Sequence, residues 1–305
     1  MTPPAESATP PTALEQLYEW LTVCVKTLFA RARSGQPLDT SEAVRLVMKI
    51  PPIETEQCQE LLTLLEGHSQ DNYLYSHCVN VTFLVSHLGR RLGYPEESIH
   101  ELALAGLLHD IGMAGEAEQL SSLPRTLTAE EWKVIAAHPT TAFEQLKTIA
   151  GLPQEVLAAI SAHHERPDGR GYPGGLRDSA VADYGRVLAV CDVYDALTHP
   201  RGYRQRRLSP AHAVKVLIDG ANDRFDRRVV KALVDELSLY PRGSAVRLST
   251  NEVGVVEQVH PGAPLRPVVL IRRDANRTPL HRPRRVDLLD QPFVYVKEVV
   301  TDEEA

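Results

Sequence analysis

Cysteine, tryptophan and methionine are scarce in this sequence. Its 305 residues include 4 Cys, 2 Trp and 3 Met. Cys24, Cys58, Cys78 and Cys191 lie far apart and form no Cys-x-x-Cys pair. That spacing argues against a disulfide framework and against a zinc site built on thiolates. We therefore expect four buried thiols in a reducing compartment.

Long hydrophobic runs and an excess of basic residues are also missing. No apolar run approaches the roughly 20 residues that span a bilayer, and the N-terminus has no charged-then-apolar signal pattern. We expect a cytoplasmic protein with no membrane partner. Lys and Arg number 33 against 40 Asp and Glu, for a net charge of -7. This balance argues against binding a nucleic-acid polymer and leaves room for a local basic pocket.

The apolar pattern predicts a mainly α protein. Residues 1–12 are rich in proline, and we expect a disordered tail. Apolar residues then recur at helical spacing as far as residue 240, and no alternating strand pattern interrupts them. The expected helices are 13–33, one starting near 39, one following Pro51-Pro52 to about 66, 71–92, 96–110, 128–147, 153–164, 180–197, 208–219 and 226–238.

The character of the chain changes after residue 240. Short β-branched runs at 245–248, 253–256, 267–271 and 293–296 are separated by turn residues, which is typical of strands. The predicted organisation is a helical N-terminal module (13–70), an all-α domain (71–240) and a small β-rich appendage (241–305). The N-terminal module fits a regulatory or dimerising role, so a homodimer is left open.

Histidines and aspartates cluster at the ends of apolar helical runs. His163-His164 closes the run 156–162, and His109-Asp110 closes the run 102–108. Neighbouring helix positions point about 100° apart, so a His-Asp pair cannot face one ion together unless it lies at a helix end or between two ions. A carboxylate can bridge two cations, one on each oxygen. The pattern predicts a dinuclear metal centre for phosphoester hydrolysis, and its nitrogen and oxygen ligands suit Fe, Mn, Zn or Ni.

The order of these motifs identifies a resemblance. His109-Asp110-Ile111-Gly112, His163-His164-Glu165 and Asp168-Gly169-Arg170-Gly171-Tyr172-Pro173 resemble the HD-GYP family, a branch of the HD phosphohydrolases known for hydrolysing cyclic di-GMP. The match continues through Asp192-Val193-Tyr194-Asp195, Arg201-Gly202-Tyr203-Arg204 and Phe225-Asp226, and it covers about residues 71–238. An all-α HD-type helical bundle is the fold that this resemblance implies.

The resemblance also implies a role for each matching residue. The metal ligands would be His77, His109, Asp110, His138, His163, His164 and Asp192, with Asp110 as the bridge and therefore a catalytic residue. Two divalent transition metals are implied, Fe first and Mn second, with Zn and Ni left open. Asp71 would act as a second catalytic residue that orients water, or it would cap its helix.

Substrate and partner contacts are implied as well. Arg201 and Arg204 match positions that contact the phosphates and guanine of cyclic di-GMP, and Tyr172 could stack or hydrogen-bond there. The loop formed by Asp168, Gly169, Gly171, Tyr172 and Pro173 matches a contact surface for partner domains of the diguanylate cyclase (GGDEF) type.

Two positions depart from the family pattern. Tyr73 stands where some members have a glutamate that helps to hold a third metal, and Met113 stands where a lysine often lies near the scissile phosphate. The expected activity is metal-dependent hydrolysis of cyclic di-GMP to pGpG, with further cleavage to GMP left open. The alternatives are a catalytically weak sensor or docking scaffold, a hydrolase for another nucleotide, and di-iron redox chemistry.

Overall fold

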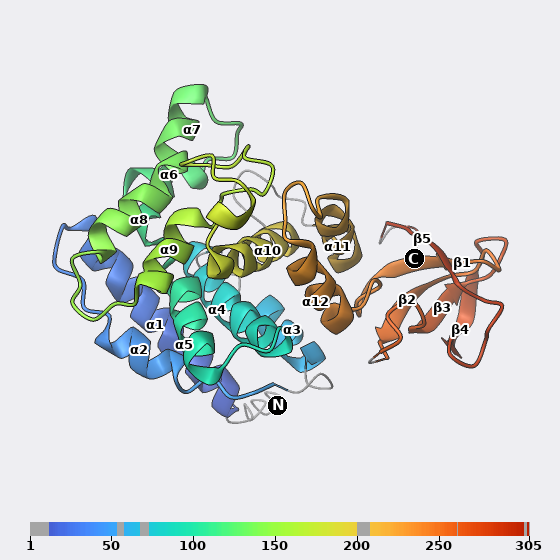
Figure 1. The fold of residues 1–305 in the computed structure, drawn as a ribbon. Coiled ribbons are helices and arrows are strands. Elements are labelled where there is room, and N and C mark those ends of the chain that lie inside the picture. The colour runs from blue at the N-terminus through green and yellow to red at the C-terminus, as the bar shows by residue number, and fades with distance from the viewer. Residues whose placement is uncertain are drawn as a thin grey trace, which may run out of the picture.

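The protein is a body of helices followed by a five-stranded sheet, described from a computed structural model (Figure 1). The structure describes residues 12–53, 58–67, 73–199, 208–260, 262–301 and 304. The helices are α1 (Ala13–Arg33), α2 (Ser41–Val47), α3 (Cys58–Gly67), α4 (Tyr73–Arg91), α5 (Glu96–Leu108), α6 (Glu116–Ser121), α7 (Ala129–Ala136), α8 (His138–Leu146), α9 (Gln154–Ala162), α10 (Asp183–Thr198), α11 (Pro210–Asp219) and α12 (Arg227–Leu237), with the short 3-10 helices η2 (Ile111–Met113) and η3 (Asp178–Ala180).

One apolar core runs through the helical body. Buried side chains from α1 to α12 are in continuous contact, and Leu21, Phe29 and Phe83 among them are fully buried. Burial of such large side chains is the main stabilising contribution in a fold of this kind. The helices of the expected N-terminal module therefore share their core with the helices that follow. The division at residue 70 stays a prediction.

The sheet is antiparallel and has its own small core. Its strands β1 (Ala245–Leu248), β2 (Val253–Gln258), β3 (Val268–Arg273), β4 (Pro279–Asp287) and β5 (Val296–Val299) pair in the order β4-β3-β2-β1-β5. Val246, Leu248 and Ile271 are completely buried within it. In Figure 1 the sheet lies beyond α12, on the opposite side from α7. The predicted fold class, a mainly α chain with a C-terminal β-rich part, is confirmed.

Local differences from the expected elements have identifiable causes. The helix expected over 128–147 divides at Ala137 into α7 and α8, because Pro139 has no N–H to donate to the carbonyl of Ile135. The ring Nδ1 of His138 donates to that carbonyl instead, at 2.8 Å. The strand β4 was not expected, since it is rich in arginine and contains Pro283. It is an exposed edge strand, where both residue types are tolerated.

Two further expectations concern the last strand and the cysteines. The run 293–296 was expected to be a strand, but β5 spans Val296–Val299 and the side chain of Phe293 is 91% exposed. Turn geometry at this point, rather than β propensity, decides where pairing begins. All four cysteines are buried free thiols, as expected. Among the described helices, none combines the length and the apolar character needed to cross a membrane.

Ion pairs of a buried glutamate connect α12 to α4. Glu236 is 4% exposed, and its carboxylate lies 2.9 Å from Nε2 of His87 and 2.5 Å from Nε of Arg91. Burial and the charge of Glu236 raise the pKa of the neighbouring Cys58 thiol to about 12, so this thiol stays protonated. Loss of one partner from such a buried link leaves the others without their hydrogen bonds.

We therefore expect Glu236→Ala to lower the free energy of unfolding by about 2 kcal/mol, because His87 loses its buried partner. Urea denaturation followed by circular dichroism measures this change. Lys231→Ala is the matched control on the same helix. It removes only an exposed pair with Asp235 and should cost less than about 0.5 kcal/mol. Equal losses in the two variants would contradict the role of this link.

Candidate metal centre

Three histidines of the site lie at the end of a helix. His109 directly follows α5, His163 directly follows α9, and His138 lies two residues after the end of α7, as the first residue of α8. In each of them Nδ1 lies 2.8, 2.8 and 2.6 Å, respectively, from the backbone carbonyl oxygen three residues earlier. The last carbonyls of a helix have no partner within the helix, and an imidazole N–H can donate to them. Because a carbonyl only accepts, each Nδ1 carries the hydrogen and each Nε2 presents a lone pair.

These lone pairs converge on one place. Nε2 of His138 lies 3.0 Å from Nε2 of His163, and Nε2 of His109 is buried with no hydrogen-bond partner among the described residues. Burial lowers the pKa of His138, and burial with the nearby His164 lowers that of His163 well below its ordinary value. Neutral imidazoles whose acceptor nitrogens face one another are suited to a cation.

Asp110 lies between two groups of histidines. Its Oδ2 is 3.5 Å from Nε2 of His109 and 3.8 Å from Nε2 of His77, whereas its Oδ1 is 3.2 Å from Nε2 of His138. Burial acts to raise the pKa of Asp110, but the surrounding imidazoles lower it below its ordinary value. The carboxylate is therefore ionised and presents one oxygen to each group.

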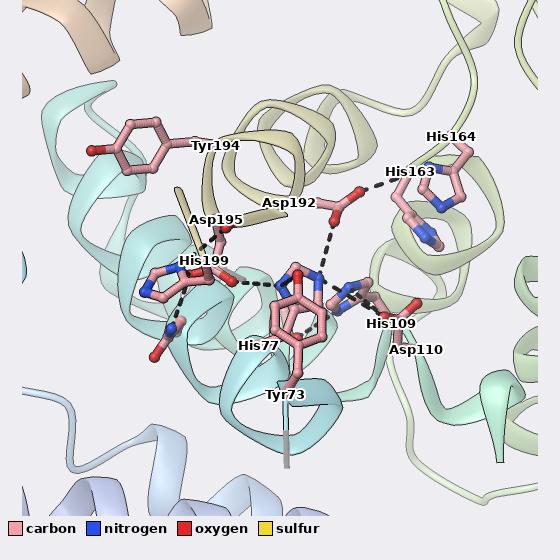
Figure 2. A network of polar contacts seen from close by, with 12 residues as sticks. Tyr73, His77, His109, Asp110, His163, His164, Asp192, Tyr194, Asp195 and His199 are labelled. Atoms are coloured by element: carbon pink, nitrogen blue, oxygen red, sulfur yellow. Dashed lines mark hydrogen bonds and ion pairs between the residues drawn. The ribbon is translucent and has the colours of Figure 1, made fainter. Parts of the chain in front are cut away.

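Asp192, on α10, completes the cluster. Its Oδ1 lies 3.0 Å from Nε2 of His77, and its Oδ2 lies 3.7 Å from Nδ1 of His164. Figure 2 shows both aspartates and four of the histidines turned toward a common centre. Donor atoms of the seven expected ligands form groups within 4.8 Å: His77, His109 and Asp192; His138, His163 and His164; His109, Asp110 and His163. These imidazole and carboxylate donors fit the binding of divalent metal ions.

A second carboxylate holds His77 from behind. Oδ2 of Asp195, which is fully buried, lies 2.6 Å from Nδ1 of His77, while Asp192 faces Nε2 on the other edge of the ring (Figure 2). These two carboxylates raise the pKa of His77 to about 10, against the effect of burial. A carboxylate on the far nitrogen fixes the orientation of a ligand imidazole. No role was expected for Asp195 from the sequence, although its place three residues after Asp192 puts both on one face of α10.

The same aspartate connects the site to the N-terminal helix. Its Oδ1 accepts a hydrogen bond from Nδ2 of Asn80 at 2.9 Å and lies 2.9 Å from Nδ1 of His199. Oδ1 of Asn80 in turn accepts from the hydroxyl of Tyr18 on α1, also at 2.9 Å. A buried polar network of this kind is rigid when each member is satisfied. It ties the ring of His77 to a helix that contributes no ligand.

Gly112 explains how Asp110 and His138 come together. A Cβ at this position would lie 2.1 Å from the carbonyl oxygen of His138 and 2.6 Å from the amide nitrogen of Ala142. Only glycine lets η2 pack this closely against the first turn of α8. The glycine of the His-Asp-x-Gly motif therefore belongs to the geometry of the metal centre.

The loop after α9 folds back over His164. Gly171 again permits close approach, since a Cβ there would lie 2.6 Å from the carbonyl oxygen of His164. The amide of Tyr172 donates to that carbonyl at 3.2 Å, and the two rings lie 4.7 Å apart, tilted by 33°. Glu165, another residue without an assigned role, accepts hydrogen bonds from the amides of Gly174 and Leu176 and anchors the loop.

The remaining loop residues are at or near the surface. Asp168 pairs with Arg166 at 2.6 Å, Gly169 has a positive φ of 74°, and Pro173 is exposed after a cis peptide bond with Tyr172. Asp71, Arg201 and Arg204, three residues with expected roles, lie outside the described residues. Their positions relative to the centre therefore stay predictions.

A cavity of about 470 Å³ opens over the centre. Asp110, His138, His164 and Asp192 line it, together with Tyr172 and Met113. Met113, at the sequence position where a lysine is often found, is 6% exposed and presents an apolar side chain to the cavity. Tyr73 does not extend into this cavity wall but packs on His77, with the ring centroids 5.3 Å apart. The cavity wall also contains Trp132, for which no role was expected from the sequence.

Comparison with known proteins gives the family. An HD domain model matches residues 45–229, and a model described as a KOW domain associated with HD domain matches residues 245–305. A cyclic di-GMP phosphodiesterase of Pseudomonas aeruginosa is 36% identical over 247 residues, which cover 81% of this chain and 59% of that protein. A cyclic di-GMP phosphodiesterase of Borreliella burgdorferi is 27% identical over 198 residues, covering 65% and 52%.

Two more comparisons bear on substrate and fold. A 3'3'-cGAMP-specific phosphodiesterase of Vibrio cholerae is 36% identical over 137 residues, which cover 45% of this chain and 31% of that protein. The chain thus spans less than two thirds of the length of these relatives. The solved structure of an HDG"Y"P protein from Bdellovibrio bacteriovorus shares the fold, with a TM-score of 0.59 and 18% identity over 75% of this chain and 74% of that one.

The HD model covers more than half of the chain, His109 and Asp110 lie in the donor cluster, and Tyr172 of the Gly171-Tyr172-Pro173 motif lines the cavity above it. HD domains bind divalent metal ions, in agreement with the clustered donors. The chain belongs to the HD domain family, in its HD-GYP branch.

Proposed function

We propose that this protein is a metal-dependent phosphodiesterase that hydrolyses cyclic di-GMP to pGpG at a dinuclear His/Asp centre. The observation that carries the proposal is the position of Asp110, whose two oxygens face two different groups of histidines. The names of the relatives from Pseudomonas aeruginosa and Borreliella burgdorferi support cyclic di-GMP as the substrate. Further cleavage of pGpG to GMP is left open.

Each metal would have its own ligands. His77, His109 and Asp192 would hold one ion, His138, His163 and His164 would hold the other, and Asp110 would bridge them. Two carboxylates neutralise only half of the charge of two divalent cations, and the five imidazoles are neutral when they act as ligands. The excess positive charge favours an anionic phosphodiester. Iron is the proposed metal and manganese the second choice, with zinc and nickel left open, because the donors are nitrogen and oxygen.

The protein's own residues would position the reactants. When bound, the metals would supply Lewis-acid activation of water and neutralisation of charge on the phosphoryl oxygens. The helix-end carbonyls would keep the rings of His109, His138 and His163 oriented, and Asp195 would do so for His77. Tyr172 would form part of the substrate wall.

Three residues enter the proposal on sequence grounds alone. Arg201 and Arg204 would pair with the phosphates and guanine of the substrate, since a guanidinium can form two parallel hydrogen bonds to a phosphate. Asp71 would orient the attacking water. None of the three lies within the described part of the chain.

Partner binding is a further part of the proposal. The loop of Asp168, Gly169, Gly171, Tyr172 and Pro173 would contact a diguanylate cyclase-type domain, and its surface position supports this role. Residues 71–240 would form the catalytic domain and 241–305 an accessory domain, in line with the KOW match. The helices before residue 70 would have a regulatory or dimerising role.

Two observations keep alternatives open. Met113 lines the cavity with an apolar side chain, so the protein could bind a cyclic dinucleotide and cleave it slowly or not at all. The relative from Vibrio cholerae, named 3'3'-cGAMP-specific, supports a different cyclic dinucleotide as substrate. Product analysis with both nucleotides distinguishes these alternatives.

We expect Asp110→Asn to reduce the formation of pGpG by about 10³-fold or more, because the bridge between the ions is weakened and several kcal/mol of charge stabilisation are lost. The protein is reconstituted anaerobically with Fe²⁺ or Mn²⁺, and the products are separated by chromatography. Asp219→Asn, an exposed change on α11, is the control. Metal and nucleotide binding without any product in the unmutated protein would instead support a sensor.

We expect Asp195→Asn to weaken metal binding by about 10- to 100-fold, because the ring of His77 loses the carboxylate that orients it. Titration with Mn²⁺, followed by the loss of its free-ion electron paramagnetic resonance signal, measures the affinity. Asp183→Asn is the matched control, since it makes the same change at an exposed position of α10. Unchanged affinity in Asp195→Asn, at unchanged thermal stability, would refute this positioning role.

A further inference from the structure

Two kinds of side chain line the cavity over the metal centre. Asp110, His138, His164 and Asp192 are the groups that the proposed function places at the phosphate. The apolar lining residues are Met113, Leu127, Trp132, Ile135, Val193 and Ala196, and Ser121, Arg125 and Thr126 add polar groups. A cavity that combines charged and apolar lining suits a ligand that combines a phosphate with a planar heterocycle.

Trp132 is the most exposed of these apolar lining residues. Its side chain is 51% exposed, although an indole gains much from burial. It lies on α7, a helix with no fully buried residue. About half of this large aromatic residue is thus exposed beside the cavity.

Both polar contacts at its first turn and the partly buried Val134 and Ile135 hold α7 in place. Thr128 and Glu131 form a reciprocal capping box. The carboxylate of Glu131 also forms a two-pronged ion pair with Arg125, at 2.6 and 2.8 Å. The uncovered indole is therefore held at the cavity by a defined helix start, which is the pre-organisation that a binding residue requires.

Aromatic rings connect Trp132 to the metal ligands. The Tyr172 ring lies 4.7 Å from that of His164, and the Trp132 ring lies 6.2 Å from that of Tyr172, at 77°. Tyr172 and Trp132 thus form a corner that begins directly above a ligand histidine. A base attached to a phosphate at the centre can lie flat on one ring of this corner and meet the edge of the other.

We propose that Trp132 is a substrate-binding residue, on which one purine base of the dinucleotide stacks while its phosphodiester lies at the metal centre. This inference rests on the proposed function and adds the subsite that binds the base. Stacking on an aromatic ring tolerates any base, so this subsite provides affinity and does not distinguish guanine from adenine.

Steady-state kinetics of the metal-loaded protein test the proposal. Trp132→Ala should raise KM for cyclic di-GMP by about 10- to 100-fold and change kcat by less than about threefold, and Trp132→Phe should restore most of the loss. KM for 3'3'-cGAMP, where it is cleaved, should rise by a similar factor. Trp20→Ala is the matched control, because Trp20 is 48% exposed on α1 and should leave both constants unchanged.

Binding is measured independently of turnover. Since the chain has only two tryptophans, Trp20→Phe leaves Trp132 as the single indole reporter. Rapid mixing of this variant with cyclic di-GMP should quench its fluorescence before turnover, with an amplitude that saturates. The Trp132→Phe variant, which retains Trp20, should show no quenching.

The outcomes separate the two proposals. Turnover by the unmutated protein with an unchanged KM in Trp132→Ala would overturn the role of Trp132 and leave the phosphodiesterase intact. Saturable quenching of Trp132 without turnover would support the subsite and overturn the phosphodiesterase. A loss confined to kcat, together with a lower melting temperature, would make Trp132 structural and overturn the inference. Absence of both turnover and quenching would overturn both.

Discussion

The hydrogen bond from an imidazole Nδ1 to the last carbonyls of a helix is the interaction on which the rest of this site depends. It occurs at His109, His138 and His163, and in each case it is accepted by a carbonyl in the last turn of a helix. The same bond fixes the tautomer, so that Nε2 must present its lone pair to the centre. The same hydrogen bond therefore caps the helix end and orients the ligand imidazole. The apolar helices α5 and α9 place His109 and His163 by burying their own sides in a common core, and α7 packs against that core through the partly buried Val134 and Ile135.

Close packing positions Asp110 beside these three histidines, and a buried hydrogen-bond network positions His77. Gly112 lets the chain after Asp110 touch the first turn of α8, which puts the carboxylate beside His138. Asp195 holds His77 from the opposite edge of its ring. Its further contact through Asn80 reaches α1, so the first helix of the chain contributes to the rigidity of a ligand far from it in sequence.

Above this rigid centre the cavity is built from less buried parts. The loop that carries Tyr172 is folded by Gly171 and by the carboxylate of Glu165, and α7 is held by its own capping box. Polar caps, together with the partly buried Val134 and Ile135 of α7, thus hold the walls that face a ligand. Elements with few buried contacts open locally more easily than buried helices. This property suits a wall that must admit and release a nucleotide.

The sequence by itself determined the helical class of the body and the later β-rich part, because helical periodicity and strand propensity are local patterns. Its resemblance to the HD-GYP family predicted the seven donors, which the fold brings into clusters. The sequence did not determine β4, an edge strand that pairs with β3 and whose Arg284 and Arg285 form ion pairs with Glu252 and Glu257. It also assigned no role to Asp195, Glu165 or Trp132, since each acts on residues brought near by folding. Only the tertiary structure decided which oxygen of Asp110 faces which histidines, because that depends on helix packing across the core.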